Sequence, residues 1–180
     1  MFIIQDGFYS NPEQVREYAL GLDFSVSGNY PGLRTEPYPE PYFTNMKLAL
    51  EKIVNRKITF WKAGYNTAFQ YTTEESRTWT HYDATQWAAV VYLTPDAPME
   101  SGTGIYRHKE TGIYQHKEGQ IDFNKTPHSE DEWELFDYCA NVFNRIVVYE
   151  GTLYHRSRLP GFGKTKYDGR LFQTFFFNTE

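Results

Sequence analysis

The sequence predicts a mainly β domain, a sheet sandwich or barrel with helices at its flanks. Aromatic residues make up 18% of the 180 residues, and flat rings suit the pleated surface of a sheet. From residue 58 onward the chain consists of short apolar runs separated by turn-forming residues, whereas the first 57 residues show helical periodicity. Helices followed by many short strands are typical of a sheet backed by helices.

The first 57 residues are expected to form one short strand and two helices. The strand covers residues 2–4, and a helix begins at Pro12, because Asn11 is a good N-cap and proline fits the first helical position. Residues 25–41 are rich in Gly, Pro and Tyr and predict an ordered loop. The second helix covers residues 44–55, with four apolar side chains facing the core: Met46, Leu50, Ile53 and Val54.

The rest of the chain is expected to be mostly strands. Their predicted ranges are residues 58–61, 67–72, 86–94, 145–150, 153–157 and 170–178. A third helix is predicted at about residues 129–140, because Ser129 to Glu132 has the form of a capping box with an acidic first turn. We expect one domain over residues 1–180, with a helical preface (1–57) and a β core (58–180).

Composition excludes several classes of partner. The net charge of −5 gives no long-range attraction for nucleic acids or anionic membranes. The N-terminal apolar run is too short for the signal peptide of a secreted protein, so none is expected, and no apolar run reaches the length of about 18 residues that a membrane span needs. The single cysteine, Cys139, excludes an intramolecular disulfide and is consistent with a reducing compartment. We therefore expect a cytoplasmic protein without nucleic-acid or membrane partners.

Two histidines and one aspartate form a candidate metal site. His81 and Asp83 are two positions apart, so in extended backbone both side chains point to one face. His155 lies on a predicted strand that could run beside them. Two imidazoles and one carboxylate form the facial triad of iron(II) oxygenases, which leaves positions open for cosubstrate and O₂. Taken singly, His81 could be a polar loop residue and His155 a hydrogen-bonded core histidine.

The order of the surrounding motifs resembles the 2-oxoglutarate/iron(II) dioxygenase superfamily, and in particular its compact prolyl-hydroxylase-like branch. The resemblance covers roughly residues 58–178, through HYDATQWAAVVYLTP, GTGIYRHKETG, NRIVVYEGTLYHRS and GRLFQTFFF. It implies a double-stranded β-helix, which is a jelly roll of the cupin type. It also implies that His81, Asp83 and His155 bind Fe(II), with 2-oxoglutarate and O₂ as cosubstrates. The implied activity is hydroxylation of an amino-acid-like small molecule or a peptide side chain.

The same resemblance requires a cation for the distal carboxylate of 2-oxoglutarate. Arg170 opens the last predicted strand, and its planar guanidinium suits a carboxylate. Where the family commonly has Ser or Thr two residues later, this chain has Phe172. Tyr71, on the strand before the metal pair, is the candidate for the missing hydrogen bond, unless it is a plain core aromatic. Arg170 could equally be a surface residue, and the alternative cations are Arg156, Arg158 and Lys164. The expected walls of the site are Trp79, Trp87 and Tyr154.

An eight-residue tandem repeat interrupts the predicted strands. Residues 103–110 read TGIYRHKE and residues 111–118 read TGIYQHKE. Since the side-chain period of a strand is two, a slip of eight residues keeps every face, and either copy could occupy the same strand. The surplus copy would be a simple loop extension, or a projecting flap beside the active-site mouth that contributes to substrate choice. On either interpretation, a protein without residues 111–118 is predicted to fold.

Other candidate sites and functions are weaker. A second metal site at His108 and His116 is not needed, because the duplication accounts for their spacing. We expect His128 to be solvent-exposed and Cys139 to serve packing. A non-enzymatic metal-binding jelly-roll module is the main alternative function. A zinc hydrolase is a further alternative, but the sequence has no His-Glu-x-x-His element that would supply its general base.

Overall fold

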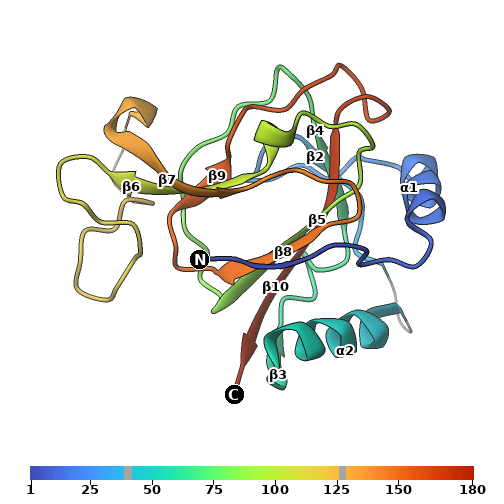
Figure 1. The fold of residues 1–180 in the computed structure, drawn as a ribbon, viewed down its shortest axis with the longest axis horizontal. Coiled ribbons are helices and arrows are strands. Elements are labelled where there is room, and N and C mark those ends of the chain that lie inside the picture. The colour runs from blue at the N-terminus through green and yellow to red at the C-terminus, as the bar shows by residue number, and fades with distance from the viewer. Residues whose placement is uncertain (39–41, 126–128) are drawn as a thin grey trace.

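The computed structural model describes residues 1–38, 42–125 and 129–180 (Figure 1). These residues form two α-helices and ten strands. Those of the N-terminal part are β1 (Ile3–Gln5), α1 (Pro12–Gly21), β2 (Leu33–Arg34), α2 (Tyr42–Val54), β3 (Ile58–Trp61) and β4 (Phe69–Thr72). The remaining strands are β5 (Trp87–Tyr92), β6 (Thr103–His108), β7 (Trp133–Cys139), β8 (Ile146–Glu150), β9 (His155–Ser157) and β10 (Arg170–Thr179). Short 3₁₀ turns cover Met99–Ser101 and Glu130–Glu132.

The strands form two sheets. The large sheet has the order β1-β8-β5-β10-β4-β2, with β3 also paired to β10, and the small sheet has the order β7-β6-β9. All strand pairs among the described residues are antiparallel. In Figure 1 the small sheet lies at the upper left, with α1 at the right and α2 below the large sheet. This arrangement confirms the predicted mainly β jelly roll with flanking helices.

Alternation along the strands produces two apolar layers. On β10, Leu171 and Phe175 pack in the layer that also contains Ala19 of α1 and Leu50 of α2. Phe172, on the other face of β10, packs with Ile105 of β6 in the layer between the two sheets. The period of two in strand side chains therefore divides β10 into a helix-facing row and a row facing the small sheet.

The predicted helix at residues 129–140 is wrong. Ser129 does cap a turn, accepting a hydrogen bond from Asp131 N–H, but this 3₁₀ turn ends at Glu132. Trp133–Cys139 then forms β7, which pairs antiparallel with β6. Its Trp, Phe, Tyr and Cys side chains favour strand, and β6 supplies the backbone partner that local sequence cannot reveal. Cys139 is buried, as its packing role requires, but on a strand.

The preface contributes to the sheet as well as the helices. β1 pairs with β8 and β2 pairs with β4, so both ends of the large sheet come from the first 57 residues. Met46, Leu50 and Val54 of α2 are buried, as predicted. Part of the expected loop at residues 25–41 and the expected exposure of His128 lie outside the described residues. None of the described helices has the length and apolar character to cross a bilayer.

The first copy of the repeat forms β6, and the second copy leaves the sheet. Residues 111–118 fold back against the segment before β9, where His116 N–H donates to Thr152 O and Tyr154 N–H donates to Tyr114 O. The ring of His116 also stacks on Tyr82, with 4.1 Å between ring centroids. The second copy is therefore a packed loop rather than a projecting hairpin.

Candidate metal centre

The three predicted metal ligands converge at one point. One ligand atom from each of His81, Asp83 and His155 lies within 4.8 Å of the other two. Backbone pairing sets this geometry, because His81 N–H donates to His155 O (3.1 Å) and His155 N–H donates to His81 O (2.8 Å). Asp83 N–H donates in turn to Gly151 O at 2.7 Å. The ligands thus sit on two segments held together by main-chain hydrogen bonds.

Both histidines present the same ring nitrogen to the centre. Nδ1 of His81 lies 2.9 Å from Trp79 O, and Nδ1 of His155 lies 2.8 Å from Leu153 O. A carbonyl only accepts, so each Nδ1 carries the proton and each Nε2 keeps its lone pair. Metal-binding histidines are commonly oriented in this way by a partner on the other nitrogen. Burial, and secondly His155, lower the pKa of His81, which favours the neutral imidazole that a metal needs.

The carboxylate of Asp83 completes the donor set. Its Oδ2 is buried, has no hydrogen-bond partner among the described residues, and lies 3.3 Å from Nε2 of His155. Burial pushes the pKa of Asp83 up, but contact with His155 and the charge of Lys62 hold it below its ordinary value. A lone pair facing a carboxylate oxygen is repulsive unless a proton or a metal ion lies between them. These residues therefore fit a divalent metal ion with nitrogen and oxygen ligands.

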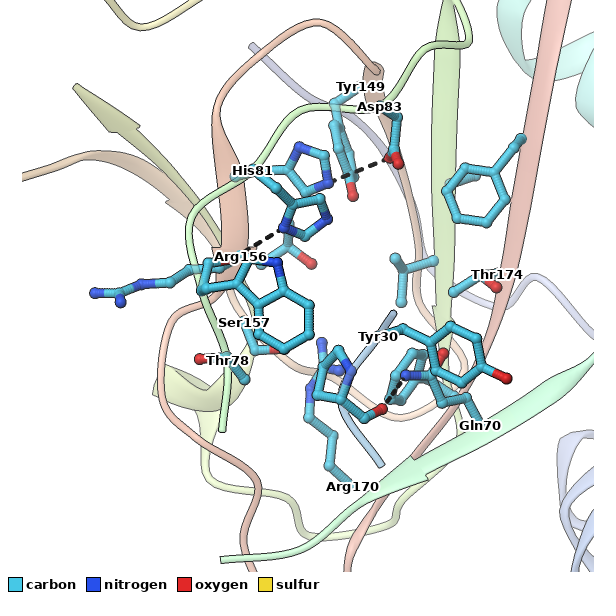
Figure 2. Close-up of a pocket in the computed structure, with 18 of the residues that line it drawn as sticks. Tyr30, Gln70, Thr78, His81, Asp83, Tyr149, Arg156, Ser157, Arg170 and Thr174 are labelled. Atoms are coloured by element: carbon cyan, nitrogen blue, oxygen red, sulfur yellow. Dashed lines mark hydrogen bonds and ion pairs between the residues drawn. The ribbon is translucent and has the colours of Figure 1, made fainter. Parts of the chain in front are cut away.

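A cavity of about 90 Å³ extends from the candidate metal ligands into the space between the sheets. Figure 2 shows His81 and Asp83 at one end of this cavity and Arg170 at the other. The buried Arg170 begins β10 and points into the cavity, where its Nε donates to Ser101 O at 3.0 Å. Its guanidinium lies 4.3 Å from the centroid of the Phe172 ring. Arg170 is thus a buried cavity residue and not a surface arginine.

The three alternative cations do not direct a charged group into the inner cavity, although Arg156 contributes to its wall. Arg156 turns away from the cavity in Figure 2 and forms an ion pair with Glu130. Arg158 lies over the Tyr138 ring, 4.6 Å from its centroid. Lys164 is exposed. Among the predicted cations, only Arg170 is directed into the space beside the metal ligands.

Tyr71 is placed on the wrong face for a cosubstrate ligand. Its ring packs against Phe24 in the helix-facing layer, while its neighbour on β4, Gln70, lines the cavity. Tyr71 therefore does not line this cavity, because the register of β4 directs its odd positions away from the small sheet. Thr174 of β10 also lines the cavity, and its buried Oγ1 has no hydrogen-bond partner among the described residues.

One of the three predicted walls lines the site. Trp79 borders the inner cavity and also an outer cavity of about 460 Å³. Trp87 instead packs beside the helix-facing layer, with Nε1 donating to Thr179. Tyr154 belongs to a separate aromatic cluster behind the small sheet. Residues 111–118 line neither cavity, so the flap interpretation of the repeat is not supported.

Sequence analysis missed a second buried arginine at the site. Arg34 of β2 is 6% exposed and lines both cavities. A single arginine inside a Gly- and Pro-rich loop carries no local signal for burial. Only the pairing of β2 with β4 reveals that this loop closes one side of the cavity.

A family model described as a family of unknown function, DUF6445, matches residues 1–177. The chain belongs to this family. No curated protein matches it. The description of this family names no activity.

Solved structures share the fold of this DUF6445 protein across nearly its whole length. A prolyl-4-hydroxylase from Pseudomonas putida has a TM-score of 0.55 at 15% identity, covering 99% of this chain and 92% of that chain. HygX from Streptomyces hygroscopicus, solved with nickel and 2-oxoglutarate, has a TM-score of 0.57 at 13% identity, covering 98% and 82%. A Trichoplax adhaerens prolyl hydroxylase, in complex with a hypoxia inducible factor peptide, has a TM-score of 0.56 at 14% identity, covering 98% and 82%. At these identities the likeness establishes the fold alone.

Proposed function

We propose that this DUF6445 protein is an iron(II)- and 2-oxoglutarate-dependent oxygenase that hydroxylates a small molecule or a peptide side chain. The observation that carries the proposal is the convergence of His81, Asp83 and His155, with both Nε2 lone pairs and the Asp83 carboxylate directed at one point. Three protein ligands on one side of an ion leave positions for 2-oxoglutarate and O₂. The shared fold of the solved structures supports this assignment.

Arg170 is proposed to hold the distal carboxylate of 2-oxoglutarate. It lies at the end of the inner cavity opposite the metal ligands, which is where that group would lie if the other end of the molecule bound the metal. Thr174 replaces Tyr71 as the proposed hydroxyl partner, because its Oγ1 lies in the cavity wall with its hydrogen-bonding capacity unused. Hydrogen bonds to a buried ionised group are the strong ones, so both contacts would favour one orientation of the cosubstrate.

The bound iron would supply O₂ activation coupled to decarboxylation of 2-oxoglutarate. The protein itself binds and orients the cosubstrate and the substrate, and it excludes water from the site. Trp79 and Phe176 border both cavities and give the metal surroundings apolar walls. The outer cavity is the proposed substrate site, because His81 and Asp83 line it and Arg170 does not. HygX has been solved with hygromycin B and the Trichoplax enzyme with a peptide, so both substrate classes suit this fold.

The test is iron-dependent formation of succinate from 2-oxoglutarate. We expect the purified protein with iron(II) to form succinate slowly without substrate, and Asp83→Ala to abolish it. The matched control is Asp122→Ala, because Asp122 carries the same charge outside both cavities. Metal binding without 2-oxoglutarate binding would instead identify a metal-binding module. Succinate formation that survives Asp83→Ala would refute the proposed centre.

A further inference from the structure

Arg34 is a buried cation, and only part of its guanidinium is hydrogen-bonded among the described residues. Its Nε donates to Gln70 Oε1 at 2.6 Å, and Gln70 is itself held by Pro31 O. Gly32, at φ +74, allows this loop to pass close to β4, because a Cβ there would lie 1.9 Å from Tyr71 O. The hydrogen bonds therefore fix the direction of the Arg34 side chain and leave its far end to the cavity.

The far end of Arg34 makes ring contacts but leaves one nitrogen without a hydrogen bond among the described residues. Its Nη1 is buried without a hydrogen-bond partner among the described residues. The guanidinium lies 3.8 Å from the centroid of the Tyr30 ring and 5.2 Å from that of Tyr65. Aromatic faces attract a cation but do not neutralise it or accept all its N–H groups. Burial lowers the pKa of Arg34 to about 10, so it stays charged at neutral pH.

Lys62 adds a second positive charge on the same side of the metal centre. It lines the outer cavity together with Arg34, and its Nζ lies 4.3 Å from the centroid of the Tyr65 ring. Neither Lys62 nor Arg34 forms an ion pair among the described residues. His81 and Asp83 line the same cavity, which places both cations near the candidate metal ligands.

The acids that line the outer cavity are already engaged. Glu130 forms an ion pair with Arg156 and accepts two hydrogen bonds from Thr80. Asp83 belongs to the proposed metal centre. Two cations therefore face a cavity whose carboxylates are neutralised by other groups. A buried unpaired charge is unfavourable, and an anion brought in by a ligand would relieve it.

We infer that Arg34 and Lys62 bind a carboxylate of the oxygenation substrate in the outer cavity, beside the metal centre. The inference rests on the proposed function, and it assigns the substrate class as an anionic molecule with an apolar or aromatic body. A carboxylate has two oxygens, one for the unpartnered Nη1 of Arg34 and one for the Lys62 ammonium. Tyr30, Tyr65 and Trp79 provide aromatic surface for the rest of the molecule.

The test uses a defined probe pair, 4-fluorophenylacetate and its neutral amide, followed by ¹⁹F NMR. The protein is saturated with zinc and 2-oxoglutarate, so that neither the metal nor Arg170 is available to the probe. We expect the carboxylate to bind at least tenfold more tightly than the amide. Arg34→Gln should remove this preference while leaving 2-oxoglutarate affinity within twofold of the wild type.

Lys62→Gln provides an independent variant, because its side chain is only partly buried and its loss leaves the Gln70 contact intact. It should weaken carboxylate binding severalfold, whereas Lys52→Gln, an exposed lysine on α2, should leave it unchanged. This comparison decides the matter even if Arg34→Gln does not fold.

Three results would overturn the inference. Equal affinity for carboxylate and amide would show that the cavity does not select anions. Tighter binding of 4-fluorophenyl phosphate would show that the group recognised is not a carboxylate. Loss of 2-oxoglutarate binding in Arg34→Gln would make Arg34 the cosubstrate cation.

A wild type that binds neither metal nor 2-oxoglutarate would refute the proposed function. The same probe pair on the metal-free protein would still show whether the outer cavity prefers the carboxylate to the amide.

Discussion

His81 and His155 form a reciprocal backbone pair, each donating its N–H to the carbonyl of the other, with 4.5 Å between their ring centroids. Each ring is also oriented by a carbonyl two residues earlier in its own segment. The orientation of both imidazoles is therefore set by main chain, which no side-chain substitution removes. The centre is vulnerable instead at the turn before β9, where Gly151 holds the backbone of Asp83.

Gly151→Ala is expected to weaken metal binding. A Cβ at this position would lie 2.2 Å from Thr85 O and 3.3 Å from the Cβ of Asp83. The backbone must shift, and the hydrogen bond from Asp83 N–H to Gly151 O shifts with it. We expect iron(II) affinity to fall at least tenfold, about 1.4 kcal/mol, as measured by titration under anaerobic conditions. Gly64→Ala is the control, because a Cβ there meets nothing within 4 Å. Unchanged affinity in Gly151→Ala would show that this contact does not position Asp83.

Arg170→Ala is expected to weaken 2-oxoglutarate binding by well over tenfold while metal binding persists. Truncating one partner of a buried charge pair typically costs about 2–5 kcal/mol. Equilibrium dialysis of the zinc-loaded protein with labelled 2-oxoglutarate measures the change. Arg156→Ala is the control, because its guanidinium pairs with Glu130 outside the inner cavity. If Arg156→Ala loses the cosubstrate and Arg170→Ala keeps it, the assignment of the cation is wrong.

The metal-free protein is expected to lose stability as the pH falls below about 6.5. The folded-state pKa of His81 lies below its ordinary value of 6.5, chiefly because of burial. Between these two pKa values the unfolded chain binds a proton that the folded chain does not, so acid favours unfolding. Urea unfolding at pH 7.5 and 5.5 should show a smaller free energy of unfolding at pH 5.5. His81→Gln should reduce that difference; an identical difference in the variant would show that another group is responsible.

Sequence reasoning succeeded where a pattern has a strict period. Alternation of side chains along a strand placed His81 and Asp83 on one face, and that geometry holds whatever the exact strand boundaries. Tyr71 was chosen from the resemblance alone, without regard to strand phase, and its ring packs in the helix-facing layer instead of the cavity. β7 was missed because a capping sequence at Ser129 is a local signal, whereas pairing with β6 is a tertiary one. Arg34 could not be found, since nothing local distinguishes a buried loop arginine from an exposed one.

The most direct measurement is the visible absorption of the protein with iron(II) and 2-oxoglutarate in the absence of O₂. Chelation of iron by the cosubstrate should give a weak charge-transfer band that neither component gives alone. His155→Ala and Asp83→Ala should each abolish the band, because each removes one of three ligands, while Asp122→Ala should retain it. A band of wild-type intensity in both ligand variants, or no band in the wild type, would contradict the proposed metal centre.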